Sequence, residues 1–210
     1  MRSIYTLPSL VVGGLLLAAC AGEEAMDDAA SSNMDIASGD ALACYLARGT
    51  MAEAEERPSP IRETAFTVGG NDGLLCYGAP SARGREIMGG LLIYGQPERI
   101  GANEPTTIHL SGPATVGTVA LEAGSYSIYT VATQDEWEIF INSDWERWGI
   151  PISGEVRASE VGSFTVTPEA LDEAVETLRY SFEPMAEGTM GDIVMEWENT
   201  RVKFHVHPGA

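Results

Sequence analysis

Positive charge is scarce in this 210-residue sequence. Lysine and arginine together number 12 against 31 aspartates and glutamates, which gives a formal net charge of -19 at pH 7. Lys203 is the single lysine, and the arginines are scattered along the chain. A chain with this charge repels nucleic acid and anionic lipid surfaces. We therefore expect no nucleic-acid partner.

The common catalytic and metal-binding motifs are also missing. The sequence has no G-x-S-x-G, Walker A, H-E-x-x-H or C-x-x-C motif, which excludes the enzyme families that these motifs define. His205 and His207 share one face of a predicted strand, a spacing that suits two metal ligands. Arg201 and Lys203 lie on the same face and would repel a divalent cation. We predict a solvated strand face there, no metal site and no cofactor.

The sequence has no uninterrupted apolar run of the roughly 20 residues that a membrane-spanning helix needs. Its N-terminus instead has a cationic end, a shorter apolar run and small residues, in the order typical of a secretory signal peptide, which we place at residues 1–19. The segment Leu17-Ala18-Ala19-Cys20 resembles the bacterial lipobox, whose cysteine receives acyl chains. The alternative is an ordinary secretory signal, with Cys20 a chance thiol.

A lipid on Cys20 predicts where the protein works. Two or three acyl chains give stable anchoring, so the membrane becomes a partner through Cys20, and we expect the protein in the bacterial cell envelope, facing the periplasm or the cell exterior. Residues 20–43 are small and acidic, which predicts a disordered tether. A single domain over residues 44–210 follows it.

Only three cysteines are present. If Cys20 carries lipid, Cys44 and Cys76 remain as an even pair. Disulfides persist outside the cytoplasm, so we predict a bond between Cys44 and Cys76. Two buried free thiols are the alternative.

Beyond residue 60, apolar and polar residues alternate with a period of two, and Gly or Pro interrupts the pattern about every ten residues. This rhythm predicts an all-β fold, an antiparallel two-sheet β-sandwich with jelly-roll connections as one option. At most one short helix is expected, at Pro168–Ala174 after an N-cap at Thr167. The apolar pattern slips by one position at Glu198-Asn199-Thr200, which predicts a bulge or tight turn. The expected strands are 64–68, 74–78, 106–110, a hairpin at 116–121, 125–132, 137–142, 163–167, 177–182, 192–198 and 201–206.

Two groups of residues are candidates for a binding site. The first is a polar loop site rich in arginine and glycine, whose side chains suit a carboxylate or a sugar, or else form a structural salt-bridge network. The second is Trp145 with Trp148, which suits sugar stacking or the packing of a loop onto the core. The polar loop site comprises Arg83, Arg85, Arg99, Asn103, Glu104, Glu198 and Asn199.

Several short motifs together resemble the bacterial family called domain of unknown function 2911. They occur in order between about residues 60 and 206. The family has no established activity, cofactor or catalytic residues, so the resemblance implies a single domain and no mechanism. Pro97-Glu98 stands where the family often has an aromatic or Val-Trp pair, which weakens the idea of a shared closed pocket. The motifs are Tyr77–Arg85, Gly89–Leu91, Tyr94-Gly95, Arg99–Glu104, Leu121–Ser127, Trp148-Gly149 and Trp197–Thr200.

Two functional hypotheses follow. The first is a non-enzymatic binding or envelope-structural domain, with a small ligand, a glycan or an envelope protein as partner. The second is a hydrolase-type enzyme in which Arg99 and the carboxylates of Glu104 and Glu198 line a cleft. The sequence does not set the oligomeric state.

Overall fold

The structure is a computed structural model that describes residues 42–185 and 189–209. The predicted signal peptide, Cys20 and almost all of the predicted tether lie outside the described residues. Within the described part, no helix is long and apolar enough to cross a membrane.

Seven strands form the larger of two antiparallel sheets. Its strand order is β1-β2-β4-β7-β8-β9, and the short strand β3 pairs with β7 beyond the end of β4. The strands are β1 Ile61–Val68, β2 Asn71–Gly78, β3 Pro97–Arg99, β4 Thr106–Leu110, β7 Gly124–Ala132, β8 Trp137–Asn142 and β9 Glu160–Val166.

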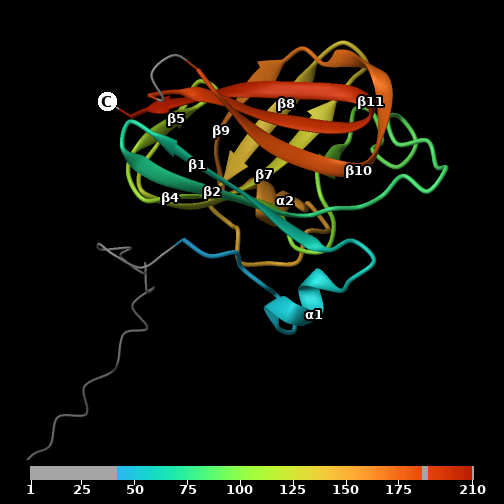
Figure 1. The fold of residues 1–210 in the computed structure, drawn as a ribbon, viewed down its shortest axis with the longest axis horizontal. Helices are drawn as coiled ribbons and strands as arrows, with labels where there is room; N and C mark the ends of the chain where they lie inside the picture. The colour runs from blue at the N-terminus through green and yellow to red at the C-terminus, as the bar shows by residue number, and fades with distance from the viewer. Residues whose placement is uncertain (1–41, 186–188, 210) are drawn as a thin grey trace, which may run out of the picture. The chain divides into compact units, whose positions relative to one another are not determined.

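The second sheet has four strands in the order β10-β11-β5-β6. In Figure 1 its long β10–β11 hairpin, coloured orange to red, lies across the strands of the larger sheet. The predicted antiparallel two-sheet sandwich is thus confirmed. The strands are β5 Ala114–Val116, β6 Val119–Leu121, β10 Glu169–Pro184 and β11 Gly191–Pro208.

The predicted helix at Pro168–Ala174 is wrong. Glu169 begins β10, and it pairs with Arg201 of β11. Cross-strand pairing there outweighs the local helix signal, because propensity is only a weak preference. The described residues instead contain two short helices, α1 at Met51–Glu55 and α2 at Gly154–Arg157. Thr50 and Glu53 form a capping box at the start of α1.

The core lies between the sheets, where the alternating apolar residues of both meet. The predicted stripes are buried there, including Ile108 with Leu110 on β4 and Trp137 with Ile139 on β8. Burial of each such side chain contributes about 1.5–3 kcal/mol, which makes this apolar layer the main favourable term in folding.

The predicted slip near Glu198 is a bulge inside one continuous strand. Glu198 has a left-handed backbone, with φ of 54°, and the register between β10 and β11 shifts on either side of Val175. Trp197 before the bulge and Val202 after it are both buried in the core. The register places the extra residues of the bulge in β10, and the left-handed backbone at Glu198 lets β11 regain its apolar face.

The larger sheet is covered on its outer face as well. All five residues of β4 are buried, including the polar Thr107 and His109, which point away from the core. Two segments cover them: the N-terminal arm (residues 42–60) and the tryptophan loop (residues 143–153). In Figure 1 the arm and α1 lie on the side of this sheet opposite the β10–β11 hairpin. This cover builds the candidate site.

Candidate functional site

The loop from Arg99 to Glu104 is held in place from several sides. The amide of Ala102 donates to the carbonyl of Gly78 at 3.1 Å. The hydroxyls of Thr106 and Tyr180 both donate to the carbonyl of Ile100, at 3.0 and 2.9 Å. A loop fixed by strands on both sides can hold polar groups at defined positions.

Glu104 holds the N-terminal arm against this loop. Its side chain is 7% exposed, and Oε2 accepts a hydrogen bond from the Arg57 guanidinium at 2.7 Å. Oε1 accepts from the backbone amide of Ala47 at 3.1 Å. Arg57 also donates to the carbonyl of Arg48. Both carboxylate oxygens are therefore occupied by the arm.

Arg99 and the tryptophan loop meet at the carbonyl of Asn103. That oxygen accepts from Arg99 Nη1 at 3.2 Å and from the amide of Gly149 at 2.8 Å. A Cβ on Gly149 would lie 2.6 Å from the same oxygen, so only glycine allows this approach. Burial lowers the pKa of Arg99 from its ordinary value. The structure thus brings together Arg99, Asn103 and Glu104 of the predicted polar loop site.

Both candidate stacking residues contact the arm or the sheet beneath it. Trp145 packs edge-on against Tyr45 and against His109, each with ring centroids 5.5 Å apart. The Arg48 guanidinium lies 4.7 Å from the centroid of the Trp148 ring. These contacts fasten the arm, as a packing role requires. Sugar stacking stays a prediction.

Sequence reasoning did not single out His109 as part of a site. Its Nδ1 lies 2.7 Å from Ser125 Oγ and its Nε2 lies 2.9 Å from Thr107 Oγ1. The residue is 3% exposed, and burial lowers the pKa of its imidazole to about 4. It is therefore neutral at pH 7 and a weak base. The sequence held a partial signal, because alternation places Thr107 and His109 on one face of β4.

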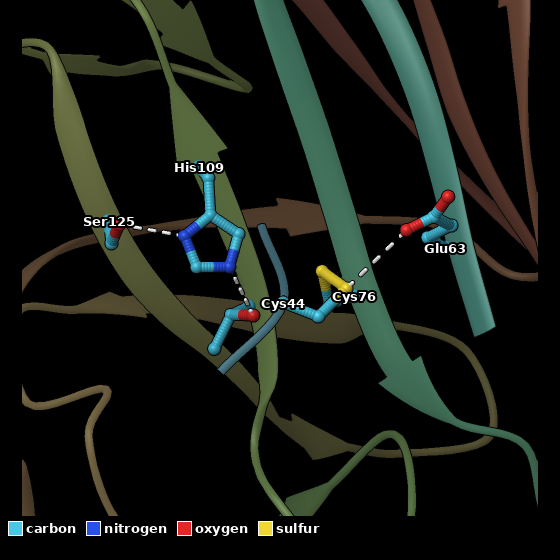
Figure 2. Close-up of a disulfide and its surroundings, with 6 residues drawn as sticks. Cys44, Glu63, Cys76, His109 and Ser125 are labelled. Atoms are coloured by element: carbon cyan, nitrogen blue, oxygen red, sulfur yellow. Dashed lines mark hydrogen bonds between the residues drawn. A yellow bond between two sulfur atoms is a disulfide. The ribbon is translucent and has the colours of Figure 1, made fainter. Parts of the chain in front are cut away.

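The predicted disulfide lies beside this histidine and is confirmed. Cys44 of the arm is bonded to Cys76 of β2, with Cα atoms 5.6 Å apart. Figure 2 shows the His109 ring next to the disulfide, with Ser125 on one side and Glu63 beyond the sulfurs. Glu63 Oε2 lies 3.9 Å from Cys44 Sγ, a contact without a hydrogen, since a disulfide sulfur carries none.

The remaining predicted polar residues lie around the 79–96 loop. Glu198 Oε1 accepts from the amide of Ile87 at 3.3 Å, and Oε2 accepts from Met88 at 3.2 Å. Arg85 donates to two carbonyls of its own loop, and Arg83 donates to the carbonyl of Pro58. Asn199 is exposed. No hydrogen bond among the described residues joins this group to Arg99, Asn103 or Glu104.

A second polar cluster on the outer face had no signal in the sequence. The Tyr129 hydroxyl donates to Glu160, which also accepts from Arg157 Nε at 2.7 Å. Tyr129 stacks on Phe140, with ring centroids 5.0 Å apart. Burial raises the pKa of Tyr129, and the adjacent Glu160 carboxylate adds to this. Sheet register brings Tyr129, Phe140 and Glu160 together, and α2 places Arg157 three residues before Glu160.

Other features of the described surface show no converging chemistry. Within residues 42–185 and 189–209, no three side chains of His, Cys, Asp or Glu gather in a way that would hold a metal ion. One shallow hollow is lined by residues 171–177 and Arg179 of β10. Another is lined by Leu42, Ser111 and residues of β1 and β2. Neither hollow contains a predicted site residue.

Comparison with known proteins identifies one relationship. A family model described as "Protein of unknown function (DUF2911)" matches residues 59–206, so most of the arm and the Cys44 end of the disulfide precede the matched region. No curated protein and no solved structure matches the chain. The chain belongs to the DUF2911 family of proteins of unknown function.

Proposed function

We propose that this protein is a lipid-anchored lipoprotein of the bacterial cell envelope whose β domain has a non-enzymatic binding or structural role. The observation that carries the non-enzymatic part is the state of its two candidate catalytic carboxylates. Each oxygen of Glu104 and of Glu198 already accepts a hydrogen bond from the protein itself.

A general acid or base must reach the proton that it transfers. Glu104 is 5% exposed beneath the arm, and Glu198 is held by two backbone amides of the 79–96 loop. Arg99 donates to the Asn103 carbonyl rather than to either carboxylate. Both carboxylates on which a hydrolase site would depend are thus used for internal contacts, and Arg99 pairs with neither.

The anchoring part is supported by the N-terminal sequence. A signal-like segment ends in Leu17-Ala18-Ala19-Cys20, and the acyl chains of a processed lipoprotein bind membranes stably. Metabolic labelling with a palmitate analogue tests it. We expect label and membrane fractionation for the natural chain and neither for Cys20→Ala. Membrane association without label would overturn lipidation.

Screening tests the non-enzymatic role. The purified full-length protein is incubated with glycan, peptide and ester libraries, and both binding and product formation are measured. We expect no turnover of any substrate. Hydrolysis that disappears in Glu104→Gln or Glu198→Gln, while Glu196→Gln keeps it, would replace this proposal with the hydrolase.

A further inference from the structure

Arg99 differs from the other half-buried arginines of the described chain. The described chain has five half-buried arginines including Arg99, and each of the other four forms an ion pair with a carboxylate within 4.0 Å. Arg99 forms none within residues 42–185 and 189–209, although the chain carries 31 acidic residues. Burial lowers the Arg99 pKa, although the neighbouring Glu98 carboxylate acts on Arg99 without forming an ion pair. A partly desolvated guanidinium without an ion-pair partner is unfavourable in a resting protein. The four paired arginines are Arg57, Arg147, Arg157 and Arg201.

The Arg99 guanidinium also has an unused hydrogen-bonding edge. Its Nη1 donates to the Asn103 carbonyl at 3.2 Å, and no other described residue accepts from it. Neither Nε nor Nη2 is among the fully buried polar atoms that lack a hydrogen-bond partner. These two nitrogens carry the parallel N–H bonds that hold a carboxylate in the two-point geometry.

The surroundings fix the position of this edge. Arg99 pairs with Tyr129 across β3 and β7, so its side chain lies on the outer face of the larger sheet. Its Cδ is 3.2 Å from the position a Cβ on Gly149 would take. Arg147 Nη1 donates to the carbonyl of the same Gly149 at 3.3 Å. The carbon chain of Arg99 is thus confined, while no described residue accepts a hydrogen bond from its Nε or Nη2. A confined side chain loses less conformational entropy when a ligand binds.

We propose that the Nε–Nη2 edge of Arg99 is the binding site for a carboxylate group of a ligand. This inference rests on the binding part of the proposed function and names its recognition chemistry. A single planar fork with one positive charge matches a monovalent carboxylate. A phosphate dianion would leave excess negative charge next to a chain of net charge -19.

The test uses thermal unfolding of the purified full-length protein at pH 7, in sodium acetate or in sodium chloride of equal ionic strength. Acetate at a tenfold excess over its Kd is expected to raise Tm by about 3–6 °C in the natural chain and not in Arg99→Met. In chloride alone, Arg99→Met should unfold at the same temperature as the natural chain or higher, because an unpaired charge is removed.

Arg147→Met is the matched control. Arg147 donates to the carbonyls of Asp144, Trp148 and Gly149, so its loss should lower Tm by several degrees and leave the acetate response intact. If Arg99→Met lowers Tm as much as Arg147→Met does, Arg99 is a structural residue and the proposal fails. It also fails if acetate has no effect, if Arg99→Met responds equally, or if only phosphate produces the shift.

A measurement on the natural chain covers the case in which a variant does not fold. The Arg99 Nε–H resonance should shift on acetate addition, while the Arg157 resonance, whose Nε is bonded to Glu160, should not. An unmoved Arg99 resonance overturns the proposal. These results are separate from the turnover assays, because an anion site is compatible with catalysis and its absence is compatible with a structural domain.

Discussion

The buried histidine on β4 makes the stability of this domain depend on pH. His109 has an ordinary pKa of 6.5 when the chain is unfolded and a pKa of about 4 when burial removes it from water. Between these values the unfolded chain binds a proton that the folded chain does not. The contribution of His109 to the free energy of unfolding is therefore fully present above pH 6.5, and it is lost as the pH falls from 6.5 through 4.

The expected loss follows from the two pKa values. A difference of about 2.5 corresponds to about 3 kcal/mol in the free energy of unfolding, of which about 2 kcal/mol is already lost at pH 5. Single domains are stable by about 5–15 kcal/mol, so this one group is a substantial share of the total.

Urea unfolding of the natural chain and of His109→Gln, at several pH values between 7.5 and 4, measures this loss. Carboxylates titrate in both proteins, so their contribution cancels in the difference between the two curves. That difference should shrink by about 3 kcal/mol across the range. The substitution also removes the hydrogen bonds of His109 to Thr107 and Ser125. Their loss lowers the free energy of unfolding of the variant by about 1–3 kcal/mol at every pH.

The reasoning is refuted if the His109→Gln curve runs parallel to that of the natural chain, or if an NMR titration finds the His109 pKa near 6.5.

Three further predictions concern the cover over the outer face. Glu104→Gln should destabilise the domain by about 3 kcal/mol and make the arm sensitive to limited proteolysis, because Arg57 loses a buried partner; an unchanged cleavage rate would contradict this. Removing the disulfide with Cys44→Ser should lower the free energy of unfolding, measured with urea, by about 4 kcal/mol. Thiol labelling of the unreduced natural protein should find no free thiol at Cys44. Gly149→Ala should lower Tm by several degrees, because the added Cβ would lie 2.6 Å from a carbonyl oxygen. Gly154→Ala is the control: its Cβ would meet nothing within 4 Å, so Tm should stay nearly unchanged.

Much of the fold could be predicted because alternation is a local signal. The strands at 106–110 and 137–142 were expected with the bounds that the structure has. The bulge at Glu198 was also visible, since a shift in apolar positions within one strand has few structural solutions. The helix prediction at residues 168–174 failed because a short N-cap signal competes poorly with pairing to β11.

The candidate site was predictable only in part. Arg99, Asn103 and Glu104 were expected as one polar loop, and they do lie together, but the choice between ligand and structural contacts depended on residues far away in sequence. Arg57 is 47 positions from Glu104, and no sequence pattern links them. The cluster around Tyr129 was missed for the same reason, since its members come from three strands and a helix.

The sequence by itself determined the all-β class, the strong negative charge, the cysteine pair and the family, because each depends on composition, local periodicity or short motifs. It also predicts the lipid anchor at Cys20. Only the tertiary structure decided that the arm covers the outer face, that Glu104 pairs with Arg57 and that His109 is sealed from water. Among the described residues it also left Arg99 without an ion-pair partner within 4.0 Å, because strand register and loop path decide which charges meet.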